Sequence, residues 1–195
     1  MKKPLGLIFL FSLILSACKK EQGEELQLNE RIDYRKASIQ LMDTIRPKLS
    51  GIWNMREVHL KVFPPLTNEI GITKDTTFKD FAVLNITTVD NSSQDFYLEH
   101  NDVRALLKFK SKTYPVGFTM MSTPTRIVNK TGPQVFTLFQ YRFQDGSHVT
   151  ENEESYLWNL GLIGENYSIE ISPDGKTMVW KGLSRAIESI YFVKN

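Results

Sequence analysis

The chain has 195 residues, of which 41% are hydrophobic and 24% charged, with 24 basic and 22 acidic side chains. This composition excludes a disordered chain, a collagen-like chain and a multi-pass membrane protein. The single cysteine excludes an intramolecular disulfide framework and a metal site built from several cysteines.

The N-terminal segment has the parts of a secretory signal peptide. Lys2 and Lys3 form a positive head, and the 15 residues from Pro4 to Cys18 are uncharged and rich in Leu, Ile and Phe. A permanent transmembrane helix needs about 20 apolar residues, so this run is too short to be one. We therefore expect residues 1–17 to be a signal peptide that is removed.

The end of this segment, Leu15-Ser16-Ala17-Cys18, resembles the lipobox of bacterial lipoprotein signal peptides. The resemblance implies cleavage before Cys18, attachment of diacylglycerol to its thiol and acylation of its amine, for example with palmitate. Several acyl chains make a durable membrane anchor. Cys18 is thus the predicted lipidation site. The alternative is an ordinary secretory peptide with a chance cysteine.

Residues 18–28 are predicted to be the lipidated cysteine and a flexible tether, because no apolar side chain occurs after Cys18 until Leu26. The charged run after Cys18 is loosely similar to the surface-export signal of Bacteroidetes lipoproteins. We expect a lipid-anchored outer-membrane protein, either on the periplasmic face or on the cell surface. Loss of Lys2 and Lys3 would leave 22 basic and 22 acidic side chains, which argues against a nucleic-acid partner.

Residues 29–46 are predicted to form one amphipathic helix. Asn29 is the expected N-cap, and Pro47 is expected to end the helix. The apolar side chains recur mostly at helical spacing: Ile32, Ile39, Met42 and Ile45. Its expected role is to pack against the domain that follows, with binding of a partner as the alternative.

From residue 52 onward, short β-rich segments alternate with turn residues. Asp145-Gly146 and Pro173-Asp174-Gly175 are typical of hairpin turns. Such a series indicates an antiparallel barrel or sandwich in one domain, residues 49–195. The expected strands are 52–62, 78–89, 94–98, 103–110, 114–121, 125–128, 135–143, 156–163, 167–171, 177–181 and 187–193.

Gly51-Ile52-Trp53, which follows the predicted helix, resembles the Gly-x-Trp motif that opens the first strand of lipocalins and of lipocalin-like (calycin-type) lipoproteins of Bacteroidetes. The resemblance implies an all-β fold: an antiparallel up-and-down β-barrel of about 8–10 strands with a short N-terminal helix. It also implies that Trp53 closes the barrel base beneath a basic side chain near the last strand. Arg185 is the first candidate for that side chain and Lys181 the second. A related β-sandwich remains the alternative.

No motif for catalysis is present, and the three histidines, His59, His100 and His148, are far apart in the sequence. We expect no enzymatic activity, no cofactor and no metal site. The interior of an eight-stranded barrel either fills with side chains or holds one small apolar ligand. The side chains that could line such a cavity are aromatic: Phe136, Phe139, Tyr141, Phe143, Trp158 and Trp180.

The leading hypothesis is therefore a non-enzymatic envelope lipoprotein whose barrel binds a small apolar or amphipathic molecule. The alternative is an accessory or structural subunit of an outer-membrane protein complex, with a filled barrel. In that case the connection over residues 63–77 would be a natural docking segment for a protein partner.

Overall fold

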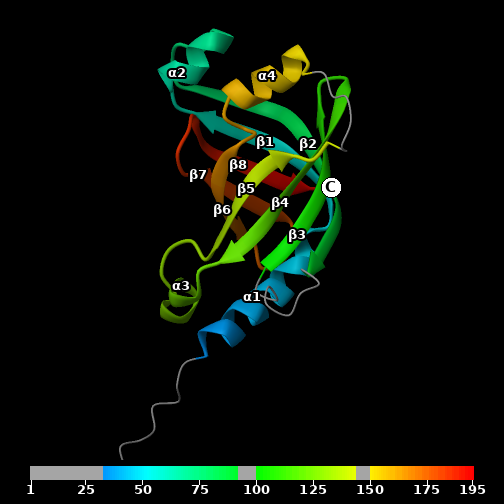
Figure 1. The fold of residues 1–195 in the computed structure, drawn as a ribbon, viewed down its shortest axis with the longest axis vertical. Coiled ribbons are helices and arrows are strands. Elements are labelled where there is room, and N and C mark those ends of the chain that lie inside the picture. The colour runs from blue at the N-terminus through cyan, green and yellow to red at the C-terminus, as the bar shows by residue number, and fades with distance from the viewer. Residues whose placement is uncertain (1–32, 92–99, 144–149) are drawn as a thin grey trace, which may run out of the picture. The chain divides into compact units, whose positions relative to one another are not determined.

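The computed structural model describes residues 33–91, 100–143 and 150–195. Within these ranges eight antiparallel strands form a closed barrel in chain order (Figure 1). Each strand pairs with the next, and pairing of the last strand with the first closes the barrel. The strands are β1 (Gly51–Leu60), β2 (Thr76–Asn91), β3 (His100–Phe109), β4 (Lys112–Ser122), β5 (Val135–Tyr141), β6 (Glu165–Ile171), β7 (Thr177–Gly182) and β8 (Ile187–Lys194). The predicted all-β, up-and-down barrel is thus confirmed.

The barrel interior is built by the two-residue alternation of the strands. In β3, Val103, Ala105 and Leu107 are buried, whereas Asp102 and Arg104 between them are exposed. Such alternation places every second side chain in the core and the others on the outer face. The outer face of each strand is therefore defined once its buried residues are known.

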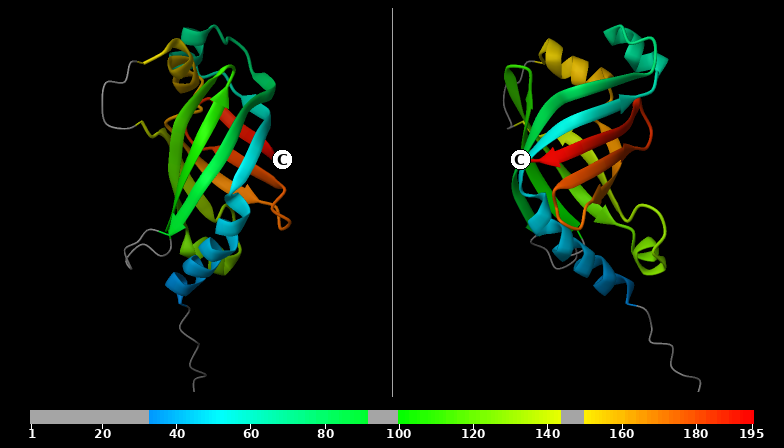
Figure 2. Two further views of the ribbon diagram at one scale, coloured as in Figure 1. Left: turned by 90° about the vertical axis from the view of Figure 1, so that its right-hand side faces the viewer. Right: turned by 180° about the vertical axis from the view of Figure 1, so that it is seen from behind.

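One end of the barrel is covered by the helix α1 (Tyr34–Leu49), which contacts β2, β3 and β4 (Figures 1 and 2). The predicted apolar stripe is confirmed in part, because Met42 is fully buried and Ile45 packs against the core. The described N-cap is Asp33, whose carboxylate accepts a hydrogen bond from the Lys36 amide at 2.9 Å. Asn29 and Ile32 lie outside the described residues.

The prediction that Pro47 ends this helix is wrong, because α1 includes Pro47 and continues to Leu49. A proline near a helix end leaves backbone carbonyls without partners. The barrel supplies two donors here: Trp53 Nε1 bonds the Leu49 carbonyl at 2.6 Å, and Lys194 Nζ bonds the Lys48 carbonyl at 2.7 Å. Tertiary contacts thus stabilise the last turn of α1.

Two predicted strands are helices. Residues 125–128 lie in α3 (Pro124–Asn129), where Pro124 occupies the first turn, a position that proline favours. Residues 156–163 overlap α4 (Asn152–Asn159) and the turns after it. The remaining discrepancy, the predicted strand 94–98, falls outside the described residues, as does the Asp145-Gly146 turn.

The helix α4 lies at the end of the barrel opposite α1 (Figure 2). Its Leu157, and Leu160 just after it, are fully buried, which gives the helix an inward face at a spacing of three residues. Lys112, in the β3–β4 hairpin, bonds Glu151 at 2.7 Å and Glu153 at 3.1 Å. Acidic side chains are favourable at a helix N-terminus, and here Glu151 is the N-cap of α4 and Glu153 and Glu154 lie in its first turn.

The connection from β1 to β2 carries two short helices, α2 (Pro64–Thr67) and η1 (Asn68–Ile70). Thr67 is fully buried, and its hydroxyl accepts a hydrogen bond from the Phe63 amide at 3.2 Å. The β6–β7 hairpin has the predicted Pro173-Asp174-Gly175 turn. Gly175 there has a φ of 67°, which glycine adopts without steric cost.

Candidate ligand pocket at the α4 end of the barrel

The Gly-x-Trp motif closes the α1 end of the barrel, and its cation is Lys194. The Trp53 side chain is fully buried, and Lys194 Nζ lies 5.1 Å from its ring centroid. A Cβ atom on Gly51, which has a φ of 122°, would come within 2.9 Å of Lys194 Cε. Glycine at this position therefore gives the lysine side chain room to cross the strand.

The prediction of Arg185, with Lys181 as second choice, is wrong. In the β1–β8 ladder Trp53 pairs directly with Lys194, the last residue of β8. Arg185 precedes β8 and so lies at the opposite end, where its guanidinium is 4.8 Å from the Trp158 ring centroid. Lys181 pairs instead with Glu170 at 3.2 Å. The pairing register between β1 and β8 determines which basic side chain lies over Trp53, and no local sequence pattern encodes that register.

Burial of Lys194 lowers the pKa of its ammonium group, because the charged form loses water contacts. The hydrogen bond to the Lys48 carbonyl and the indole ring offset part of this cost. The motif is therefore a structural clamp between α1 and the barrel.

The barrel interior is filled by aromatic rings around Trp180. The indole ring lies 5.0–5.3 Å, centroid to centroid, from four other rings, and its side chain is fully buried. Those rings belong to Phe118, Phe139, Tyr167 and Phe192. Phe139 and Trp180, predicted to line a ligand cavity, thus form the packed core instead. Phe136 is corrected too: it points outward from β5, beneath the Arg126 guanidinium at 5.3 Å.

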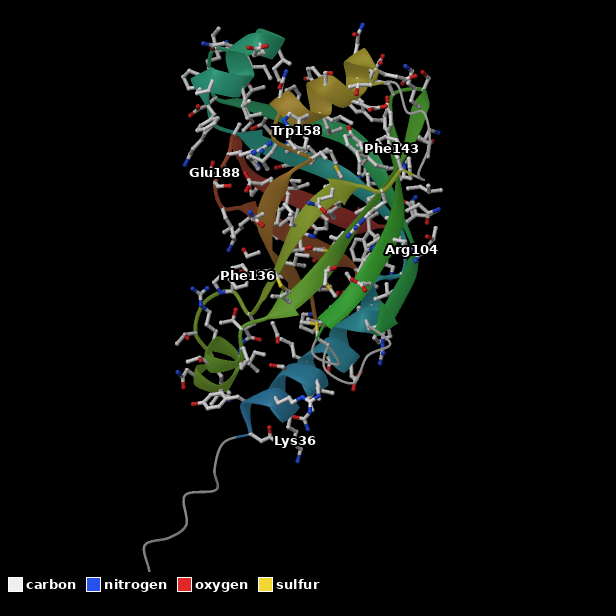
Figure 3. The ribbon with its side chains drawn as sticks, in the orientation of Figure 1. Lys36, Arg104, Phe136, Phe143, Trp158 and Glu188 are labelled. Atoms are coloured by element: carbon white, nitrogen blue, oxygen red, sulfur yellow. The ribbon has the colours of Figure 1, made fainter. Side chains whose placement is uncertain are left out.

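The other three predicted cavity residues come together at the α4 end. They line a pocket of about 400 Å³ between the end of β5 and one side of α4. Trp158 and Phe143 both lie at this end of the barrel (Figure 3). The lining combines aromatic rings with polar groups: Tyr141, Phe143, Thr150, Glu154, Ser155, Trp158 and Asn159.

Trp158 is held in place although 45% of its surface is exposed. Arg185 packs on the ring, and a Cβ atom on Gly164 would lie 2.7 Å from it. Gly164, with a φ of 78°, thus lets the indole approach the backbone closely. The position of the ring is therefore set by the protein itself, and a preformed surface of this kind would lower the entropic cost of binding a ligand.

Tyr141 forms the inner wall of the pocket. Its ring stacks on Phe143 with a centroid distance of 5.1 Å, and its hydroxyl donates to the Glu154 carbonyl at 3.3 Å. Burial raises the pKa of the Tyr141 hydroxyl, so it stays a neutral donor at physiological pH. These contacts fix α4 against the end of β5.

Two buried polar side chains, Glu165 and Tyr167, form hydrogen bonds with the loops beneath the pocket. One oxygen of Glu165 accepts hydrogen bonds from the Ser184 amide at 3.2 Å and from its hydroxyl at 2.8 Å. The Tyr167 hydroxyl lies 3.1 Å from the carbonyl oxygens of both Gly161 and Leu162. These bonds secure the segments that carry Arg185 and Gly164, and so the position of Trp158.

Four pocket residues were missed in the sequence: Thr150, Glu154, Ser155 and Asn159. Glu154 and Ser155 have a helical spacing to Trp158, because they precede it by four and three residues, and Asn159 follows Ser155 by four. The prediction of a strand over 156–163 is incompatible with this helical spacing, which α4 has. Cys18 and His148 lie outside the described residues.

His59 bonds Thr77 and Glu57, each at 3.0 Å. In the described parts of the chain, no three His, Cys, Asp or Glu side chains gather as a metal site would require. Over the same residues, no helix is both long and apolar enough to cross a bilayer.

Comparison of the chain with protein-family models, with curated proteins and with solved structures found no match. What the structure shows is a closed, eight-stranded, antiparallel up-and-down barrel with an N-terminal helix, an architecture compatible with a lipocalin-like fold.

Replacing Lys194 tests the clamp at the α1 end. Lys194→Ala removes the contact with Trp53 and the bond to the Lys48 carbonyl, so we expect the free energy of unfolding in urea to fall by about 1–3 kcal/mol. Lys181→Ala, which breaks an exposed pair, should change it by less than about 0.5 kcal/mol. Equal losses in the two variants would contradict the assigned role.

The pH dependence of stability tests the burial of Tyr167. Burial, reinforced by Glu165, raises the pKa of this hydroxyl well above the ordinary 10.0. Above pH 10 the unfolded chain releases this proton and the folded chain retains it, so stability falls as pH rises. When the pH rises from 9 to 11, the free energy of unfolding in urea should fall by roughly 1 kcal/mol less in Tyr167→Phe than in the parent protein. The control Tyr191→Phe, at an exposed position, should show the same dependence of unfolding free energy on pH as the parent. If Tyr167→Phe showed that dependence too, the assigned effect of burying Tyr167 would be wrong.

Proposed function

We propose that this protein is a non-enzymatic envelope lipoprotein that binds a small amphipathic molecule in the pocket at the α4 end. The observation that carries the proposal is the position of Trp158, exposed on one side and held by Arg185 and Gly164 on the other. The pocket volume of about 400 Å³ lies within the range of small-molecule sites.

The packed interior favours this end pocket over a central one. Carriers with a deep site need an open space between the strands, and here the rings around Trp180 occupy it. The pocket instead offers the faces of Trp158 and Phe143 beside the polar side chains of Ser155 and Asn159. A ligand with one flat apolar face and one polar edge fits this lining.

The anchor part of the proposal depends on the lipobox-like residues 15–18. A lipidated Cys18, followed by a tether up to residue 28, would hold the barrel at the outer membrane, on its periplasmic face or on the cell surface. A binding protein that does not consume its ligand would then act there as a receptor or a buffer for that molecule.

A second candidate is an accessory subunit of an outer-membrane protein complex. It is favoured by the same filled interior and by exposed apolar side chains, such as Leu183 at 51%. In this case the α4 end would contact a protein rather than a small molecule.

The ligand proposal is tested with N-phenyl-1-naphthylamine, a neutral aromatic probe whose emission rises in apolar sites. We expect saturable binding of one probe per chain, weakened about 10-fold or more in Trp158→Ala because the stacking face is lost. Tyr191→Ala removes an exposed ring on β8 and should bind as the parent does. Absence of saturable binding, or equal binding in Trp158→Ala and the parent, would favour the accessory-subunit candidate.

The anchor is tested separately in cells. Cys18→Ala should block processing of the precursor or release the protein from the membrane fraction, which immunoblotting of fractionated cells detects. Ser16→Thr changes a neighbouring lipobox residue without removing the acceptor thiol and serves as the control. Unchanged processing and fractionation of Cys18→Ala would refute lipidation at this residue.

A further inference from the structure

A hollow of about 660 Å³ lies on the outer face of β3 and β4, separate from the α4 pocket. The ladder pairs Arg104 of β3 with Gly117 of β4, and Gly117 with Gln140 of β5. Arg104, Gly117 and Gln140 thus form one row across the outer face of β3, β4 and β5. Since Gly117 has no side chain, the middle position of this row is open. Arg104 lies on the barrel wall, whereas Trp158 lies at the end near α4 (Figure 3).

Gly117 also determines where the second arginine of the hollow lies. A Cβ atom at Gly117 would come within 3.0 Å of Arg142 Cγ and 3.4 Å of its Nε. The Arg142 side chain therefore passes directly over the glycine, and it lines the hollow together with residues of β3. Its backbone amide bonds the Pro115 carbonyl at 2.9 Å, which fixes the start of that side chain.

The two guanidinium groups of the hollow have no partner among the residues that the structure describes. In the described ranges, neither Arg104 nor Arg142 forms a hydrogen bond or an ion pair through its side chain. Some other basic side chains of the barrel surface do have carboxylate partners: Arg56 with Asp80 at 2.5 Å, Lys61 with Glu188 at 2.7 Å and Lys181 with Glu170 at 3.2 Å.

The other polar groups of the hollow are already occupied. Thr119 donates its hydroxyl hydrogen to Asp102 at 2.6 Å, and Thr87 donates to the Arg104 carbonyl at 3.2 Å. Within the described part of the chain, the two guanidinium groups are thus the donors of this lining that have no partner. Asp102 contributes one negative charge, so the three ionised side chains leave the hollow with a net positive charge.

We propose that this hollow binds the phosphate group of a small soluble phosphate ester, held between Arg104 and Arg142. A guanidinium presents parallel N–H donors that match phosphate oxygens, and charge-assisted bonds of this kind are the strong ones. A phosphate monoester carries nearly two negative charges, which suits two unpaired cations. Leu106 and Pro115, opposite each other in the ladder, offer an apolar border for the carbon skeleton of the ester.

The test uses a chain from residue 19 onward, which lacks the predicted signal peptide and Cys18 and retains the whole compact unit Asp33–Asn195. Glycerol 3-phosphate is titrated into the labelled protein, and NMR follows the backbone amides of Arg104 and Gly117. We expect saturable shifts in these amides, weakened by salt because the site is exposed. Arg104→Gln and Arg142→Gln should each weaken binding about 10-fold or more.

Lys108→Gln is the matched control, because it removes an exposed positive charge from β3 outside the hollow. It should bind glycerol 3-phosphate as the parent does, and thermal unfolding should show that all variants fold. Absence of saturable shifts at millimolar ligand, or equal weakening in Lys108→Gln, would overturn the proposal. Binding to phosphatidic acid vesicles without binding to glycerol 3-phosphate would also overturn it, in favour of a lipid source of the phosphate.

Discussion

The packing of aromatic rings around Trp180 is the constraint on which the rest of the structure depends. Four rings from β4, β5, β6 and β8 converge on this indole, so the barrel closes around an interior that side chains fill. A filled barrel leaves its ends and its outer wall as the surfaces on which a ligand can bind. Both the α4 pocket and the hollow over Gly117 lie on such surfaces.

Each end of the barrel has a basic side chain packed on a tryptophan ring, but the two rings differ in exposure. At the α1 end, Lys194 lies over Trp53 and the indole is buried, which joins the helix to the strands. At the α4 end, Arg185 packs on Trp158, and 45% of the indole stays exposed. A cation–tryptophan pair thus acts as a clamp where the ring is covered, and it holds an exposed ring in position where the ring is not covered.

The candidate site could be predicted from the sequence only in part. The aromatic residues were recognised as a group, and Tyr141, Phe143 and Trp158 do line one pocket. Their companions were missed because aromatic and branched residues favour strands locally, whereas α4 is stabilised by the burial of Leu157 and by ion pairs with Lys112. Those partners come from distant parts of the chain, which local propensity cannot include.

Sequence alone was sufficient for the class of fold, because two-residue alternation and hairpin turns are local properties of the chain. It also sufficed to mark Gly51 and Trp53 as the start of the barrel. Tertiary structure decided that Lys194 rather than Arg185 covers Trp53, and that Arg104 and Arg142 flank one glycine. These outcomes depend on strand register, and register is set by closure of the whole barrel, which joins residues far apart in the chain.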